Sequence, residues 1–276
     1  MPAKRGMKKI SKLAKVKDAK PKKLAIKKIS IAGKKPEKIS ANTGFSQSSV
    51  ANAYDQIARK WDEAHTRPRN DFHFLTDYIR KVQPYSGTIL PIRVLDAGCG
   101  NGCNTSAFFS RFGNAQIECL DLSTGMLSVA SRRLSGMLLH KVRFRKGTIT
   151  NIQYPVCYFD LVMCLAAFHH LGSERERIVA LREFLRILKP GGIAFISVWA
   201  GRPASFAGKD ETIAFPTLSG EPIGRNYHFF GKPELEALSK QAGFAIVDSF
   251  YEDGGIKIPQ SKESKTRNLC VILKKR

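Results

Sequence analysis

Three glycines and two carboxylates are the residues of this 276-residue chain whose types and spacing point to chemistry. Gly98, Gly100 and Gly102 occupy alternate positions between the apolar segment 92–97 and a helical segment. Glycine is needed where a backbone turns sharply and a ligand approaches it closely. Asp96 precedes the first glycine by two residues, and its charge disfavours a pyrophosphate and suits a cationic ligand. The spacing G-x-G-x-G also differs from the G-x-G-x-x-G pattern of dinucleotide sites.

Asp121 is the second carboxylate, and it ends the next apolar segment, 116–121. The carboxyl ends of parallel strands meet at one edge of an open α/β sheet, where ligands bind. A carboxylate at that edge can accept hydrogen bonds from both hydroxyls of a ribose. The alternative is that residues 98–102 form only a tight turn in a Rossmann-like protein with a nucleotide ligand of a different kind. Asp96 and Asp121 together argue against this alternative.

Alternating strands and helices must position these side chains. Tyr54, Ile57, Ala58 and Trp61 recur at helical spacing, and Ser173 with Glu176 predicts a capping box. The pattern predicts helices from 48 and at 71–82, 105–112, 123–134, 173–188 and 233–242, and strands at 92–97, 116–121, 141–145, 159–166, 193–199, 244–251 and 268–273. We expect the last two strands to pair antiparallel. The fold class is α/β, a doubly wound, Rossmann-like, mostly parallel seven-stranded sheet with helices on both faces.

The composition indicates a polyanionic partner. The formal charge is +23, of which residues 1–40 carry +13 and the remainder +10. This excess of positive charge favours nucleic acid over a membrane surface as the partner. Residues 1–47 have regularly spaced Lys, scattered Ala, Ile and Pro and almost no aromatic side chains, so we expect a disordered tail that precedes a single domain, 48–276. The tail could be an electrostatic arm for RNA, a nuclear-import signal or only a solubilising segment.

Other classes of protein are disfavoured. No apolar run approaches the roughly 18–20 residues of a membrane helix, and the N-terminal residues lack the apolar core of a secretory signal. The six cysteines form no C-x-x-C pair, so we expect reduced, buried thiols and no metal site.

From Val50 onward the chain resembles the class I S-adenosylmethionine-dependent methyltransferases. The likeness rests on the glycine-rich segment 94–102, on Asp121 and on the turn Leu188-Lys189-Pro190-Gly191-Gly192 before a strand. It implies that S-adenosylmethionine is the cofactor. The residues implied are Asp96, Gly98, Gly100 and Gly102 for the methionine part, Asp121 for the ribose, and Leu122 for the adenine. Thr148 stands where the family often has an Asp that reaches the adenine amine, so the Thr148 hydroxyl or backbone groups would make that contact.

Four further segments resemble the eukaryotic tRNA wobble-uridine methyltransferases. These enzymes methylate the carboxylate of 5-carboxymethyluridine at the first anticodon position to its methyl ester. The segments are 54–58 with 66–68, 168–171 with 175–177, 198–200, and 225–230. The resemblance implies tRNA as substrate and a small zinc-binding activator subunit as partner, with Phe108 or Phe109 as a candidate contact. It favours the cytoplasm and leaves the nucleus open.

The expected chemistry indicates which residues could bind the methyl acceptor. A carboxylate is already a nucleophile at neutral pH, so its methylation needs positioning and no general base. Arg67 is the first candidate to hold it, because Arg grips carboxylates bidentately. His170 is the second, and Tyr227 and His228 could complete the pocket. Bases and phosphates of the RNA would meet Trp199, Arg69, Arg175 and Arg225.

Several alternatives stay open. His169 and Trp199 could be core residues, and Arg175 with Arg177 could form a solvated helical turn. Residues 201–224 match the relatives poorly, and Pro68 is followed by Arg69 where the relatives often carry Trp. The competing functions are a small-molecule methyltransferase of the quinone or sterol type, a methyltransferase acting on protein or ribosomal RNA, and a catalytically silent RNA-binding scaffold.

Overall fold

The computed structural model describes residues 46–69, 71–82, 92–136, 141–200, 207–258 and 268–276. The chain divides into two units, Met1–Lys38 and Ile39–Arg276, and all described residues belong to the second. The tail predicted for 1–47 lies outside the described residues except for its last two. Of these, Ser46 caps the first helix and Gln47 begins it.

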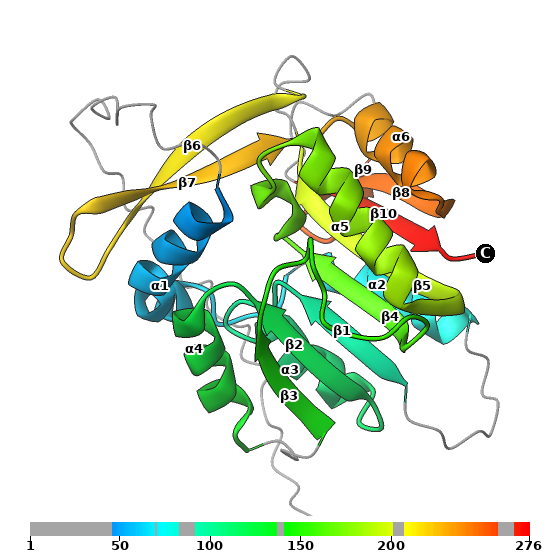
Figure 1. The fold of residues 1–276 in the computed structure, drawn as a ribbon. Helices are drawn as coiled ribbons and strands as arrows, with labels where there is room; N and C mark the ends of the chain where they lie inside the picture. The colour runs from blue at the N-terminus through cyan, green and yellow to red at the C-terminus, as the bar shows by residue number, and fades with distance from the viewer. Residues whose placement is uncertain (1–45, 70, 83–91, 137–140, 201–206, 259–267) are drawn as a thin grey trace, which may run out of the picture. The chain divides into compact units, whose positions relative to one another are not determined.

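Within the described ranges, eight strands form one sheet in the order β3-β2-β1-β4-β5-β10-β8-β9 (Figure 1). They are β1 (Arg93–Ala97), β2 (Gln116–Asp121), β3 (Val142–Lys146), β4 (Phe159–Leu165), β5 (Leu188–Trp199), β8 (Ala245–Asp253), β9 (Ile256–Ile258) and β10 (Asn268–Lys274). Neighbours among β1 to β5 run parallel, and β10 pairs antiparallel with both β5 and β8. The Rossmann-like fold and the antiparallel final pair are confirmed. The short β9 adds an eighth strand to the seven predicted.

Helices cover both faces of the sheet, as predicted. α2 (Phe72–Val82), α3 (Cys103–Arg111) and α4 (Thr124–Leu134) contribute apolar side chains to one core, and α5 (Glu174–Ile187) and α6 (Lys232–Ala242) to the other. α1 (Gln47–Ala64) packs on α4 through Ile57 and Ala58. α1 therefore covers the end of the sheet at which β2 leads into α4 (Figure 1).

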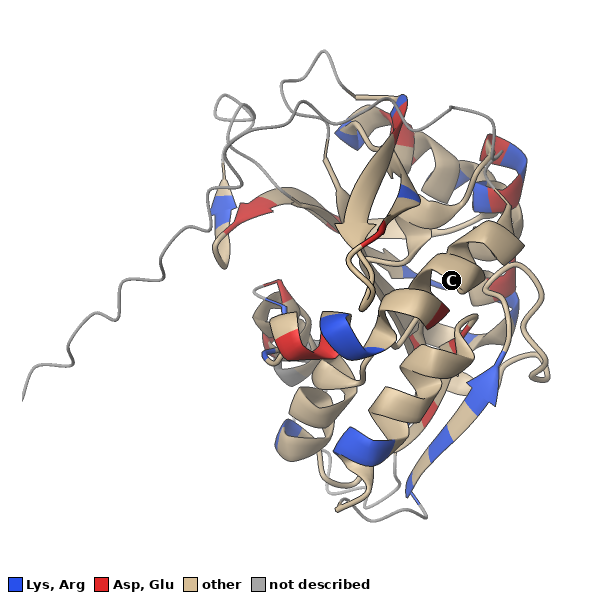
Figure 2. Ribbon diagram, turned by 90° about the vertical axis from the view of Figure 1, so that its left-hand side faces the viewer, with Lys and Arg blue, Asp and Glu red and all other residues tan. Residues whose placement is uncertain are grey.

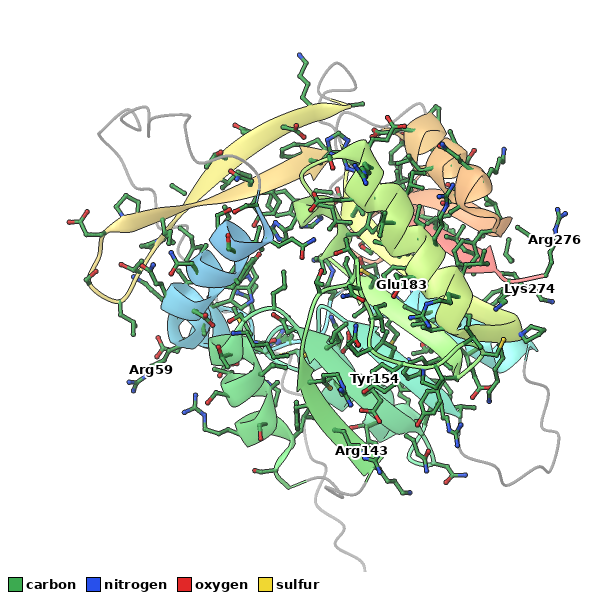
Figure 3. All side chains as sticks on the ribbon, in the orientation of Figure 1. Arg59, Arg143, Tyr154, Glu183, Lys274 and Arg276 are labelled. Atoms are coloured by element: carbon green, nitrogen blue, oxygen red, sulfur yellow. The ribbon has the colours of Figure 1, made fainter. Side chains whose placement is uncertain are left out.

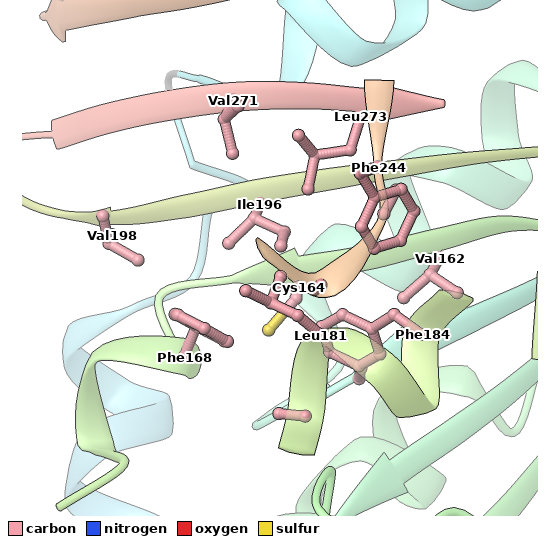
Figure 4. Packing of buried hydrophobic residues seen from close by; sticks show 14 of the residues in the cluster. Val162, Cys164, Phe168, Leu181, Phe184, Ile196, Val198, Phe244, Val271 and Leu273 are labelled. Atoms are coloured by element: carbon pink, nitrogen blue, oxygen red, sulfur yellow. The ribbon is translucent and has the colours of Figure 1, made fainter. Parts of the chain in front are cut away.

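Alternation along each strand assigns its side chains to one core or the other. Val162 and Cys164 of β4 face α5 and pack in one core with Leu181 and Phe184 of that helix (Figure 4). Met163, which lies between them in the sequence, belongs to the opposite core. Central strands buried on both faces read as continuous apolar runs, which is why their positions could be predicted.

Helix caps follow the predicted chemistry with one difference. Ser123 Oγ accepts from Met126 N at 2.9 Å, and Ser173 Oγ accepts from Glu176 N at 3.2 Å. The capping box expected at Ser173 is only half formed, because Glu176 Oε2 accepts from Gly172 N at 2.9 Å. The carboxylate therefore ties the preceding turn instead of the cap residue.

A hairpin of two strands was not predicted. β6 (Lys209–Pro216) and β7 (Pro222–Phe229) form a separate antiparallel sheet beside α1. Phe215 and Ile223 of the hairpin pack with Tyr54 and Trp61 of α1. These aromatic side chains of α1 therefore pack on the hairpin.

Candidate active site

One pocket lies at the carboxyl ends of the parallel strands β1 to β4, beneath α1. Its empty space, counted together with adjoining open solvent, is about 1120 Å³. Its walls are the glycine-rich loop after β1, residues 120–123 after β2, residues 147–149 after β3, residues 165–167 after β4, and the inner side of α1. This is the edge at which open α/β sheets bind ligands.

Each glycine of the loop has its own structural reason. All three have positive φ, at +81° for Gly98, +53° for Gly100 and +77° for Gly102. A Cβ on Gly98 would lie 2.2 Å from Ala167 Cβ, and one on Gly102 would press on α4. A Cβ on Gly100 would meet no described protein atom within 4 Å. Gly98 and Gly100 line the pocket, whereas Gly102 caps α3 and does not.

Asp121 connects the loop to the start of α4. Its Oδ2 accepts from Gly100 N at 2.8 Å and its Oδ1 accepts from Ser123 N at 2.9 Å. Burial raises the pKa of this carboxyl, and the backbone donors oppose the rise. Each carboxylate oxygen can accept a second hydrogen bond, so Asp121, which lines the pocket, can still take the two hydroxyls of a ribose.

Asp96 lies behind the loop and does not line the pocket. Its side chain is 1% exposed, and Oδ2 accepts from Thr105 Oγ1 at 2.5 Å. Burial raises its pKa to about 7, with a smaller contribution from the nearby Asp121. Asp96 therefore does not make the direct contact with a cationic ligand that we expected, and its hydrogen bond joins β1 to the first turn of α3 instead.

A guanidinium that has no partner among the described residues also lines the pocket. Arg67 follows α1, is exposed and lines the pocket. None of the described residues forms a hydrogen bond or ion pair with it. An arginine placed in this way can take an anionic group of a ligand.

Tyr54 and His170 face the same space. Tyr54 Oη lies 2.9 Å from His170 Nε2, and His170 Nδ1 lies 2.7 Å from the carbonyl of Asn226. Because a carbonyl only accepts, Nδ1 carries the proton, and Nε2 accepts from the Tyr54 hydroxyl. Burial, with a smaller contribution from Arg225, lowers the pKa of His170 to about 4, so the imidazole is neutral near pH 7.

Tyr227 and His228 lie outside the pocket, contrary to their expected roles. Tyr227 is 1% exposed and stacks on Trp199, with ring centroids 4.5 Å apart. His228 points to the opposite side of β7, where its two nitrogens contact Asp210 Oδ1 at 2.6 Å and Glu234 Oε1 at 2.7 Å. Adjacent residues of a strand face opposite sides, so the two could not both reach one pocket.

The four expected RNA-binding residues have different surroundings. Arg69 forms a bidentate pair with Asp71 and donates to Asn268 Oδ1 at 2.7 Å. Arg225 is buried against four aromatic rings, the nearest being Trp61 and Phe215, both with centroids 4.9 Å away. Arg175 is exposed in the first turn of α5. Trp199 lies in the aromatic stack with Tyr227. Of the four, only Arg175 is openly available to a phosphate.

The neighbouring His169 and Arg177 also have defined positions. His169 is buried and its Nδ1 accepts from Trp199 N at 3.1 Å, which confirms the core alternative. Arg177 is 5% exposed, donates to the carbonyl of Leu171 and lies near Asp210 and Glu234. The solvated-turn interpretation is therefore wrong for Arg177.

A polar clasp joins α1 to the loop and to α4. Asn101 Nδ2 donates to Asp62 Oδ1 at 2.9 Å and to the carbonyl of His65 at 2.7 Å. Arg133 of α4 pairs with Asp62 and donates to the carbonyl of Asn101 at 2.9 Å. Asn101 was missed as a functional candidate, although it lies between two of the glycines already singled out.

The pocket fits the predicted cofactor. The open space over Gly100, the hydroxyl-accepting carboxylate of Asp121 and the apolar Leu122 beside Thr148 form a continuous lining. Groups of three or more metal-ligating side chains do not occur among the described residues, and no helix among them is long and apolar enough to cross a membrane. All six cysteines are free thiols, and five of them are buried.

Comparison with known proteins agrees with this geometry. A methyltransferase domain model matches residues 94–192. A ubiquinone biosynthesis O-methyltransferase of Xanthomonas oryzae is 31% identical over 222 residues, covering 75% of this chain and 84% of that protein. The chain belongs to the class I S-adenosylmethionine-dependent methyltransferases, and S-adenosylmethionine is its cofactor.

Two further similarities concern particular members of the fold. A tRNA (carboxymethyluridine(34)-5-O)-methyltransferase of Arabidopsis thaliana is 30% identical over 166 residues, covering 54% of this chain and 37% of that protein. A putative methyltransferase of Haloferax volcanii, solved in complex with the Trm112 methyltransferase activator, is similar with a TM-score of 0.59 and 18% identity. That likeness covers 82% of this chain and 96% of that one, and it shows the fold alone.

Proposed function

We propose that this methyltransferase acts on tRNA and converts the carboxylate of 5-carboxymethyluridine at the wobble position to its methyl ester. The observation that carries the proposal is the guanidinium of Arg67, which lines the pocket and has no partner among the described residues. A guanidinium can hold a carboxylate bidentately and leave its attacking lone pair directed at the methyl donor.

The residues that line the pocket favour a methyl acceptor that does not have to be deprotonated. When bound, the cofactor supplies a methyl group on a positively charged sulfur. A carboxylate acceptor would take this methyl group without losing a proton, because it is already ionised, so the pocket would not need to supply a base. His170 is not required as a base, and its Nε2 is already engaged by Tyr54. Alignment of the acceptor therefore falls to Arg67. His170, the second candidate to hold the carboxylate, has no free donor for it, because both of its nitrogens have partners.

The charge of the chain supports a nucleic-acid substrate. Residues 41–276 carry a net charge of +10 beyond the basic N-terminal segment. Figure 2 shows Lys and Arg along β3, the outer strand of the sheet. Arg143 extends outward from that strand (Figure 3) and is 72% exposed. A basic surface raises the rate at which a polyanion meets the enzyme.

The Arabidopsis relative supports the same acceptor. The rival is a small-molecule O-methyltransferase, favoured by the Xanthomonas relative, which this chain covers more completely. Such enzymes act on hydroxyl groups, whose oxygen must lose a proton. Acceptors of the two kinds therefore differ in their need for a base.

We also propose that a Trm112-type zinc-binding subunit activates the enzyme. The support is the tRNA-methyltransferase resemblance, together with a partly exposed Phe109 beside the fully buried Phe108 on α3. A cytoplasmic location, with the nucleus as the alternative, belongs to the same proposal.

The test uses the full-length protein, with and without the activator subunit, and isotopically labelled S-adenosylmethionine. The acceptors are bulk tRNA from cells that lack wobble ester methylation, and a demethylated quinone precursor. Digestion to nucleosides and mass spectrometry should find the methyl ester of 5-carboxymethyluridine.

If the label were transferred to the quinone and not to tRNA, the small-molecule function would replace the proposal. No transfer to either acceptor with cofactor bound would direct the search to protein or ribosomal RNA. Absence of cofactor binding in the presence of the subunit would support a silent scaffold.

A further inference from the structure

The first side chain of α1 bridges two distant parts of the domain. Gln47 Nε2 lies 2.8 Å from Thr150 Oγ1 and 3.1 Å from Glu176 Oε1. Thr150 follows β3, and Glu176 lies in the first turn of α5. Gln47 itself lines the pocket, together with Thr148 and Ile149. Its side chain is therefore fixed from one side and faces the pocket from the other.

The contact with Glu176 fixes the orientation of the Gln47 amide. An ionised carboxylate accepts hydrogen bonds and cannot donate them, so the atom facing it is the amide nitrogen. The carbonyl Oε1 of Gln47 is then directed away from both partners. Among the described residues nothing donates a hydrogen bond to this oxygen. Gln47 thus presents an unused acceptor at the pocket.

Thr148 presents the complementary group. Thr148 Oγ1 accepts from Thr150 N at 3.1 Å and lies 2.8 Å from Thr150 Oγ1. Either hydroxyl can donate in this contact, and donation by Thr150, whose oxygen accepts from Gln47, is the arrangement that leaves the Thr148 proton free. Both lone pairs of the Thr148 oxygen are then used, and its own proton remains available to donate into the pocket.

An acceptor beside a donor matches the edge of one purine base. Adenine offers an exocyclic amine, which donates, next to ring nitrogens, which accept. No carboxylate follows β3 to take the amine, because Thr148 occupies that position. We infer that Gln47 Oε1 accepts the adenine amine of the cofactor and that the Thr148 hydroxyl donates to a neighbouring ring nitrogen.

This assignment gives α1 a part in cofactor recognition. Thr148 belongs to the body of the domain, and Gln47 belongs to the helix above it. Recognition of the base therefore depends on both elements, and Gln47 is held in place for it by Thr150 and Glu176. The inference needs only the cofactor and is independent of the methyl acceptor.

The test compares two ligands by calorimetric titration. One is S-adenosylhomocysteine, and the other is its 6-deamino analogue, which carries hydrogen in place of the amine. The wild-type protein should prefer the first by about five- to tenfold, the effect of one neutral hydrogen bond. In Gln47→Leu this preference should disappear through weaker binding of S-adenosylhomocysteine, with affinity for the analogue unchanged.

A matched control lies on the same helix. Gln56 is exposed, bonds only to Asn52 at 3.2 Å among the described residues, and does not line the pocket. Gln56→Leu makes the same chemical change and should keep the wild-type preference. Thr150→Val leaves Gln47 intact but removes one of its two supports, and it should reduce the preference about two- to threefold.

Two results would overturn the inference. Equal weakening of both ligands in Gln47→Leu would mean that Gln47 only supports α1. An unchanged preference would mean that another group accepts the amine. Melting temperatures of the ligand-free variants, measured in parallel, would separate either result from a loss of folding.

Discussion

The hydroxyl of Tyr54 and Nε2 of His170 are 2.9 Å apart, and this hydrogen bond joins the helix over the pocket to the turn after β4. The other nitrogen of the ring is held by the carbonyl of Asn226 on β7. One imidazole thus connects α1, the main sheet and the hairpin. Its tautomer is set by these partners.

His170 should stay neutral throughout the physiological range. Its pKa is lowered to about 4, whereas an unfolded chain has a histidine near 6.5. The unfolded state therefore binds the extra proton first, so stability falls as pH decreases from about 6.5 towards 4. NMR of the ring nitrogens at pH 6 should find the proton on Nδ1. A titration midpoint near 6.5 would contradict the geometry.

Asp96 should give stability a pH dependence opposite in sign to that of His170, and Asp96→Asn should remove it. The folded pKa of about 7 lies above the unfolded value of 3.8, so the folded state binds the extra proton between these values. Wild-type stability should fall as pH rises from about 4 to 7, by up to about 4 kcal/mol. The variant carries no proton there and should lack this slope. Urea unfolding of both proteins across this range, without cofactor, measures the difference.

Asp121→Asn should weaken cofactor binding by tenfold or more. The amide keeps one acceptor oxygen but places its NH2 group against one of the two backbone donors, Gly100 N or Ser123 N, which now donate to the carboxylate. Asp248→Asn is the control, because Asp248 pairs with Lys257 away from the pocket. Calorimetry with S-adenosylmethionine compares the two. Similar affinities in both variants would remove Asp121 from the ribose site.

Arg67→Ala should spare cofactor affinity and reduce methyl transfer to RNA. A hydrogen bond to a charged group contributes about 1.5–3 kcal/mol, so we expect a loss of roughly ten- to a hundredfold in kcat/KM. Arg59 points outward from α1 (Figure 3) and is exposed, so Arg59→Ala is the matched control. Undiminished methylation in Arg67→Ala would exclude Arg67 from the acceptor site.

His228→Ala should loosen the hairpin and leave cofactor affinity unchanged. The imidazole joins Asp210 of β6 to Glu234 of α6, and Arg177 lies beside the same two carboxylates. Its loss removes the contacts with both carboxylates and should cost about 1–3 kcal/mol of stability. Faster hydrogen exchange at the amides of β6 and β7 would report the change. A loss of cofactor affinity would contradict this structural role.

The central part of the fold could be predicted because its signals are local. Buried strands such as β2 and β4 are continuous apolar runs, and Ser123 and Ser173 mark the starts of helices. The hairpin gave no such signal. β6 begins with Lys209, Asp210 and Glu211 and is mostly exposed, so its pairing with β7 depends on contacts with α1 that no local pattern encodes.

The cofactor side of the site was predicted better than the acceptor side. Glycine spacing and a strand-terminal carboxylate locate the loop and Asp121, because both follow from position along the chain. The burial of Arg225 among aromatic rings and the pairing of Arg69 with Asp71 depend on tertiary packing. The opposite orientations of Tyr227 and His228 follow from strand alternation, which applies only once residues 222–229 are known to form a strand.

The position of β10 has a consequence for how the protein is made. β10 follows every other strand in the sequence, yet it lies between β5 and β8 in the sheet. β8 reaches the sheet only through β10, since the register pairs Asn268–Lys274 with both neighbours. While the ribosome is still translating, β5 has an open edge and β8 has no place to dock. We expect the nascent chain to stay sensitive to aggregation and to chaperones until residues 268–274 emerge.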